Sequence, residues 1–296
     1  MRVPTTGRFA AQHGAKLLHH VNAQIARTTE SQGVDEVHDL RVAIRRFRRI
    51  LDVLRPCFPP GEAKQIERAL KKIISRAGDV RDIDIALKLT GKIEPADESP
   101  SVLVQKLQED RTNAAAALHK VLSREGPQKA PKSPSSPTAF SAIPMDRLAR
   151  RILPAMAAEH LRCVHKAART SPSDKKIHEV RIEARNFRYT LECFAPIYGA
   201  ELAIILEQLE DVQDRLGAMH DCAIAREMIR EIVSGIKSPA KKQTLDALKK
   251  RRKKKEKKFR DLYAAADTEN ARARQWKQIL LRVRPPARKP RKSNAA

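Results

Sequence analysis

Two stretches of the chain read VHDLRVAIRRFRRILDVLRPCF (residues 37–58) and IHEVRIEARNFRYTLECFAPIY (residues 177–198). They align without gaps at an offset of 140 residues, which pairs His38 with His178, Arg41 with Arg181, and Arg45 with Arg185. A second pair of segments, SRAGDVRDIDIA (75–86) and DRLGAMHDCAIA (214–225), aligns at an offset of 139 residues. Two copies of this length indicate an internal duplication.

Apolar residues in both long stretches recur every three or four positions, which is the spacing of an α-helix. They form one stripe in each copy: Val37, Leu40, Ile44, Phe47, Leu51 and Leu54 in the first, and Ile177, Val180, Ala184, Phe187, Leu191 and Phe194 in the second. Side chains three and four residues apart share one face of a helix. We therefore predict that each stretch is a helix with this stripe turned toward a core.

The rest of the chain is also typical of helix, because it holds 10 glycines, only 4% aromatic residues and long segments of Ala, Leu, Glu, Lys and Arg. We find no convincing strand. Apolar spacing and proline positions predict helices at 9–29, 34–57, 60–90, 100–124, 143–170, 174–197, 199–236 and 238–281. Gly78 and Gly217 lie inside the third helix of each set, where either glycine could kink or split the helix.

Residues 123–141 separate the two sets of helices and hold four prolines and five serines, a composition typical of a flexible linker. We predict an all-α fold of two antiparallel four-helix bundles related by a pseudo-twofold axis. The first bundle would take residues 1–122 and the second residues 142–281. Residues 282–296 are basic, rich in proline and poor in apolar residues, so we expect a disordered tail there.

The chain carries 60 Lys and Arg residues against 35 Asp and Glu residues, a net charge of +25, which indicates a polyanionic partner. Nucleic acid, anionic lipid and other phosphate-rich polymers all meet that description. Residues 241–261 contain 12 basic and 3 acidic residues, and residues 282–296 contain 6 basic residues and no acid. These two stretches hold most of the excess charge, and we expect them to supply generic attraction to anions.

Several classes of protein do not fit the sequence. The apolar runs are too short to span a bilayer, and no secretory signal precedes the first helix, so we expect a soluble cytoplasmic protein. The four cysteines lack CxxC spacing, which argues against a disulfide framework or a zinc knuckle. No GxxxxGK[ST] loop, HExxH motif or acidic cluster for magnesium is present. We therefore expect no metal, no cofactor and no catalysis.

A second stripe runs beside each apolar stripe and consists of histidine and arginine. Its members are His38, Arg41, Arg45 and Arg48 in the first copy, and His178, Arg181, Arg185 and Arg188 in the second. A solvated helix face would alternate acids with these bases at i, i+4, but here all four positions are basic or imidazole. A guanidinium group offers a planar fork of donors that matches phosphate, so each stripe indicates an anion site. For each histidine, a role inside its own bundle remains an alternative.

Two further candidates lie outside the stripes. Arg252 and Lys255 occupy core-facing heptad positions of the last helix, between Leu248 and Phe259, so they could line a wet or anion-filled cavity. The alternative, which the pattern slightly favours, is that the basic run is a solvated extension or a nucleic-acid patch. Lys16 and His20, at i and i+4 on the first helix, are a weaker pair.

HDLRVAIRRFR and HEVRIEARNFRYTLE resemble the two signature segments of the CHAD domain, the conserved histidine α-helical domain. LKKIISRAGDVRDIDIA and LEDVQDRLGAMHDCAIA resemble the segments that follow them, and the likeness extends from about residue 9 to Trp276. The resemblance implies two helical bundles around a basic cavity that binds inorganic polyphosphate, and association with polyphosphate granules. It places in that cavity His38, Arg41, Arg45, Arg46, Arg48, His178, Arg181, Arg185 and Arg188.

The chain also departs from this family. Asn186 stands where a second basic residue is usual, which implies a weaker grip by the second copy. Asp82 and Asp221 take matching positions after the glycines, where each would either orient a stripe residue or cap a helix. Tyr189 and Glu192 are interpreted as structural. The family is often fused to a CYTH triphosphatase domain, whose alternating glutamates do not occur in this sequence, so we expect a stand-alone binding module.

The sequence therefore predicts a non-catalytic polyphosphate-binding protein. Sequence-independent nucleic-acid binding through the basic C-terminal segments is the alternative, although no aromatic residue is interleaved there to stack on bases. A phosphorelay bundle that carries phosphohistidine on His38 or His178 fits less well, because the surrounding arginines suit an external anion.

Overall fold

The computed structural model describes residues 3–93, 101–129, 138–232 and 239–282, and this part of the chain is all-helical. Its helices are α1 (Thr6–Glu30), α2 (Val34–Val53), a 3-10 turn (Arg55–Cys57), α3 (Pro60–Thr90), α4 (Val102–Glu125), α5 (Met145–Arg169), α6 (Asp174–Tyr198), α7 (Glu201–Ile232), α8 (Pro239–Tyr263) and α9 (Ala266–Leu281). The predicted fold class and most predicted helix limits are confirmed to within a few residues.

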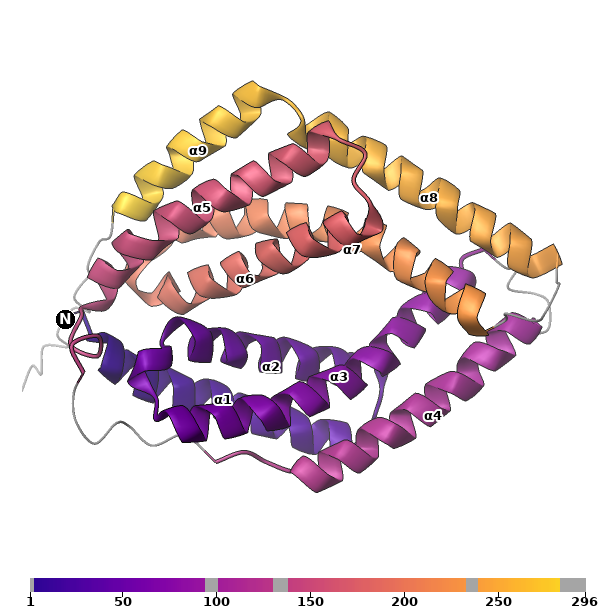
Figure 1. Ribbon diagram of the computed structural model, residues 1–296, viewed down its shortest axis with the longest axis horizontal. Helices are drawn as coiled ribbons and strands as arrows, with labels where there is room; N and C mark the ends of the chain where they lie inside the picture. Colours follow the sequence, from indigo (N-terminus) through magenta and orange to yellow (C-terminus); the bar gives the residue numbers. More distant parts are fainter. Residues whose placement is uncertain (1–2, 94–100, 130–137, 233–238, 283–296) are drawn as a thin grey trace, which may run out of the picture.

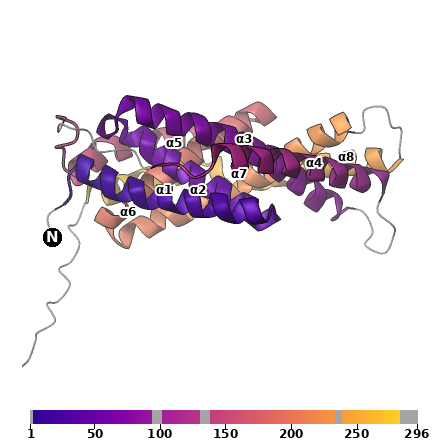
Figure 2. The ribbon, with the colours of Figure 1, turned by 90° about the horizontal axis from the view of Figure 1, so that it is seen from below.

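The helices form two groups that meet along the middle of an elongated, flat molecule (Figures 1 and 2). Helices α1 to α4 pack on one another in the first group, and α5 to α9 do so in the second. The groups meet mainly where α2 packs against α6 and α3 packs against α7, with smaller contacts between α1 and α5 and between α4 and α7. Helices α2, α3, α6 and α7 carry the repeated segments of the sequence, so the repeats lie at the centre of the molecule.

The two predicted apolar stripes face the interior. All twelve of their residues have an exposed fraction of 1% or less. Phe47 and Leu51 of α2 belong to the same apolar cluster as Phe187 and Leu191 of α6, so one core runs across both groups. Because this packing sets the rotation of α2 and α6 about their axes, it also sets the direction of the neighbouring His-Arg stripes.

The prediction of one continuous helix over residues 238–281 is wrong, because the chain turns between α8 and α9. Phe259 and Tyr263 of α8 pack in a cluster with α7, whereas Trp276 and Leu280 of α9 pack in the core beside α5. A straight helix could not reach both places. His165 of α5 lies at the turn, where its Nδ1 is 3.1 Å from the carbonyl oxygen of Tyr263 and its Nε2 is 3.2 Å from Glu269.

Two other expectations need adjustment. The helix predicted to reach residue 57 ends at Val53, and the 3-10 turn that contains Pro56 follows it, as expected where proline removes a backbone donor. Helices α3 and α7 continue unbroken through Gly78 and Gly217.

The ends of the predicted linker are held by hydrogen bonds. Asn22 bonds the backbone of Gln128 through both its amide oxygen and its amide nitrogen, each at 2.8 Å. At the other end, the Ser141 carbonyl oxygen accepts from the Gly7 amide at 3.0 Å. Residues 130–137 of that linker and residues 283–296 of the predicted tail lie outside the described residues.

Candidate functional site: a basic cavity between the two groups of helices

A cavity of about 570 Å³ lies where α2 and α6 approach α7. Helix α2 contributes His38, Val42, Arg45 and Arg46; α6 contributes Arg181, Arg185, Arg188 and Tyr189; and α7 contributes Glu210, Gln213, Asp214, Gly217, Ala218 and Asp221. Six of the twelve predicted site residues therefore line it. They come from both copies of the repeated stretch, as the sequence predicts.

Arg45, Arg181 and Arg185 lie close together in this cavity. None of them forms an ion pair with a carboxylate of the described residues. Burial, and then the nearby charges of Arg45 and Arg181, lower the pKa of Arg185 to about 9. Burial also lowers the pKa of Arg45, and Arg181 adds to the effect. A lowered pKa means that the charged form is destabilised in its surroundings. An anion placed among these guanidinium groups would remove that penalty.

Arg41 lies next to this cluster but against α3. Its Nη1 donates to the Ile74 carbonyl oxygen at 3.3 Å, and burial together with repulsion from Arg45 lowers its pKa to about 10. A Cβ at Gly78 would come within 2.7 Å of that Nη1. The glycine expected to kink α3 instead leaves room for the Arg41 side chain.

Two aspartates accompany the arginines. Burial raises the pKa of Asp82 on α3, and Arg41 and Arg181 oppose that shift. Burial raises the pKa of Asp221 on α7 as well, again against Arg181. Both residues lie well inside their helices, so the alternative that they cap helices is wrong. They lie beside the stripe arginines, where a carboxylate can orient a guanidinium group.

A histidine pair lies at the start of the α6 stripe. His178 Nδ1 is 3.4 Å from Nε2 of His220 on α7, and the ring centroids are 4.9 Å apart. Burial, then Arg181 and His178, lower the pKa of His220 to about 4. Sequence reasoning missed His220 as a site residue. The available signal was its place in the sequence repeat, where His220 aligns with Arg81 of the first copy.

Ion pairs centred on Glu192 join α2 to α6 beside the cavity. Glu192 accepts from Arg46 Nε at 2.9 Å and from Arg188 Nε at 3.1 Å. Arg188 is also 3.4 Å from both Gln213 and Glu210. Arg46 and Arg188 are thus partly neutralised, whereas Arg45, Arg181 and Arg185 carry the unpaired charge of the cavity.

The other predicted residues lie elsewhere. Lys16 is exposed on α1, and the half-buried Arg48 has an Nε atom without a hydrogen-bond partner among the described residues. Arg252 on α8 is held by Asp174 and Glu256, each at 2.7 Å, and by the Pro172 carbonyl oxygen at 2.9 Å. Its burial is therefore offset by ion pairs, and neither Arg252 nor Lys255 is among the residues that line the central cavity.

Fold and site together define an all-helical protein with a basic cavity built from a repeated His-Arg motif. The sequence profile of the CHAD domain matches residues 12–230, so the chain belongs to the CHAD domain family. The resemblance inferred from the sequence is confirmed. No helix of the described residues is long and apolar enough to cross a membrane.

Two solved structures share the fold. The crystal structure of the CHAD domain from the plant Ricinus communis is 20% identical, with a TM-score of 0.62 over 93% of this chain and 93% of that one. PptA from Streptomyces chartreusis is 16% identical, with a TM-score of 0.55 over 94% of this chain and 99% of that one. No curated protein matches the sequence.

Proposed function

We propose that this protein binds inorganic polyphosphate, without catalysis, in the central basic cavity. The family to which it belongs is associated with polyphosphate. The observation that carries the proposal is the cluster of Arg45, Arg181 and Arg185, whose charges repel one another in a half-buried site. A linear polyanion with one charge per phosphate would pair with several of these guanidinium groups at once.

The size of the cavity favours a slender ligand. Pockets for small ligands usually measure about 300–1,000 Å³, and the 570 Å³ here is within that range. Polyphosphate carries no sugar or base, so several of its phosphate units would fit such a space. A nucleic-acid duplex would not.

The absence of catalysis rests on the sequence. Phosphoryl transfer generally requires magnesium and a phosphate-cradling loop, and the chain contains neither a P-loop nor an acidic cluster of the required kind. The cavity is lined by five arginines and by the separate carboxylates Glu210, Asp214 and Asp221. We infer that it stabilises a bound polyanion in its ground state.

The cavity draws one His-Arg stripe from each copy of the repeat, which fits a duplicated ancestor. Helices α2 and α6 begin at Val34 and Asp174, an offset of 140 residues that equals the offset of the repeat. We propose that the two groups of helices arose by that duplication and are related by a pseudo-twofold axis. Association with polyphosphate granules in the cytoplasm would follow from the same ligand.

Sequence-independent nucleic-acid binding is the alternative, and the exposed lysines of α8 favour it. A competition experiment between long-chain polyphosphate and DNA separates the two functions. We expect polyphosphate to displace DNA, and to stay bound at a salt concentration that has released the DNA. If both ligands are lost together along one salt titration, the proposal is wrong.

Two variants locate the site in the same assay. Arg45→Glu with Arg185→Glu should weaken polyphosphate binding more than DNA binding, and truncation after Leu281 should do the reverse. Arg8→Glu with Lys120→Glu, on exposed positions of α1 and α4, is the matched charge control. Loss of polyphosphate binding in the truncated protein, with retention in the double arginine variant, would contradict the site assignment.

A further inference from the structure

The outer face of α8 carries the densest positive charge of the described residues. Residues 249–260 expose seven cations: Lys249, Lys250, Lys253, Lys254, Lys257, Lys258 and Arg260. We call these seven residues the α8 ridge. The one acid within this segment, Glu256, is buried and pairs with Arg252 at 2.7 Å. The ridge therefore presents three turns of helix without an exposed carboxylate.

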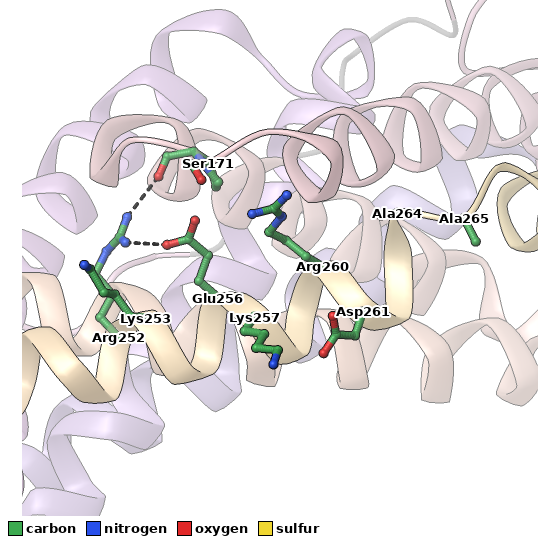
Figure 3. Close-up of a pocket in the computed structure, with 10 residues that line it drawn as sticks. Ser171, Arg252, Lys253, Glu256, Lys257, Arg260, Asp261, Ala264 and Ala265 are labelled. Carbon is green, nitrogen blue, oxygen red and sulfur yellow. Dashed lines mark hydrogen bonds and ion pairs between the residues drawn. The ribbon is translucent and has the colours of Figure 1, made fainter.

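Part of the ridge borders a groove. Lys253, Lys257 and Arg260 line a hollow of about 1100 Å³ together with one exposed acid, Asp261, and with Ser171 and Pro172, which connect α5 to α6. Figure 3 shows the Arg260 side chain beside that connection, and Arg252 with its hydrogen bonds to Glu256 and to the Pro172 carbonyl oxygen. Because Arg252 uses its donors within the protein, it shapes the groove and leaves Lys253, Lys257 and Arg260 to meet a ligand.

A run of contacts through the start of α6 leads from the groove to residues beside the central cavity. Arg252 pairs with Asp174, the first residue of α6, and Asp174 lies one turn before His178. His178 contacts His220 and lies close to Arg181 of the central cavity. The first two turns of α6 therefore carry both the residue that pairs with α8, Asp174, and a lining residue of the central cavity, Arg181.

We propose that the α8 ridge is a second, outer binding tract for the same polyphosphate chain whose inner segment occupies the central cavity. This inference rests on the proposed function. Contacts between exposed lysines and phosphates are individually weak and salt-sensitive. A segment already tethered in the cavity has a high effective concentration at the ridge, so weak contacts there raise the affinity for long chains.

The ridge fits a bare phosphate chain better than a single-stranded nucleic acid. Single-stranded nucleic acids are usually bound by basic grooves that also offer aromatic side chains for base stacking. The aromatic residues of α8, Phe259 and Tyr263, are buried in the protein with exposed fractions of 0% and 5%. The described part of the ridge thus provides charge without a stacking surface.

The experiment compares long-chain polyphosphate with tripolyphosphate, which is short enough for the central cavity alone. The ridge variant is Lys253→Glu with Lys257→Glu and Arg260→Glu. Its control is Arg8→Glu with Lys71→Glu and Lys120→Glu, which makes the same change in net charge at exposed positions away from α8. Circular dichroism and thermal unfolding check that both proteins are folded.

We expect the ridge variant to lose at least about tenfold in affinity for the long chain, and less than about twofold for tripolyphosphate, relative to the control. The negative slope of log affinity against log salt concentration should become shallower by about 2, for the long chain only. Unchanged long-chain affinity, or an equal loss of both ligands, would overturn the inference. Loss of DNA binding alone would assign the ridge to nucleic acid. If the wild-type protein binds neither polyphosphate, the proposed function itself fails.

Discussion

The His38 stripe of α2 and the His178 stripe of α6 carry arginines at matching positions but have different neighbours. Arg41 lies against Gly78 and bonds the backbone of α3, whereas its counterpart Arg181 lines the central cavity together with Gly217. The cavity is lined by α2, α6 and α7, and α3 supplies none of its lining residues. Matching residues in a repeat therefore do not guarantee matching access to a ligand.

The same asymmetry appears at two other pairs of positions. Arg46 lines the cavity, but its counterpart Asn186 lines a separate groove beside α5. The lack of a basic residue at position 186 therefore takes little positive charge from the central cavity. Arg81 of α3 corresponds to His220 of α7. A permanent cation in one copy is thus replaced by a group that titrates in the other.

The largest expected effect is a difference between Arg181→Gln and Arg41→Gln. A lost charge-assisted hydrogen bond to phosphate costs about 1.5–3 kcal/mol, so Arg181→Gln should weaken polyphosphate binding by roughly 10- to 100-fold. Arg41→Gln should weaken it by about threefold or less, because Arg41 lies against α3. Isothermal titration of both variants measures the difference. Equal losses would show that ligand reaches both arginines and that the asymmetry is a property of the free protein only.

A smaller effect concerns pH. Burial and nearby arginines lower the pKa values of His220 and His178 in the free protein, and a bound polyanion would raise them. Binding then takes up protons, so affinity should rise as the pH falls from 8 to 5. The groups that face His220 are Arg181, His178, Asp174 and Arg185.

Exchanging the residues between the copies tests this assignment. His220→Arg should raise affinity at pH 8 and flatten the dependence on pH, whereas Arg81→His should steepen it. Isotherms at pH 8, 7, 6 and 5 provide the measurement. A pH profile that His220→Arg leaves unchanged would assign the proton uptake to other groups.

The smallest effect separates the two glycines. A Cβ at Gly217 would meet nothing within 4 Å, so Gly217→Ala should stabilise α7 by about 0.5–1 kcal/mol and raise Tm by about 2 °C. Gly78→Ala should gain less, because the new methyl group must displace Arg41 Nη1. Thermal unfolding of both variants is the measurement. Equal gains would mean that Arg41 moves aside without cost.

Much of the fold could be predicted because it depends on local periodicity. The apolar stripe from Val37 to Leu54 repeats at the helical period, and its residues are buried as predicted. The turn between α8 and α9 was not predictable in this way. Helical periodicity continues through residues 264 and 265, and only the distant packing of Trp276 beside α5 makes the chain turn.

The residues of the candidate site also fall into those that local sequence pattern predicts and those that depend on distant contacts. His38, Arg45, Arg181 and Arg185 were identifiable because the repeat places bases where a solvated helix would alternate charges. His220 was missed, because its one signal was its alignment with Arg81 in the repeat and it lies outside the two His-Arg stripes. For Arg252 the sequence left a cavity and a solvated basic run as alternatives, and its partners Asp174 and Pro172 are 78 and 80 residues away in sequence. Such a partner is found only in the folded chain.

Residue order determined the helices, their inward faces, the basic flank of α2 and α6, and the net positive charge of the chain. All of these follow from interactions between residues a few positions apart. Tertiary packing decided which arginines of the cavity form no ion pair among the described residues, that α7 and not α3 lines the cavity, and that Arg252 of α8 pairs with Asp174 at the start of α6. These features depend on contacts between segments far apart in sequence, and the packing of whole helices selects those contacts.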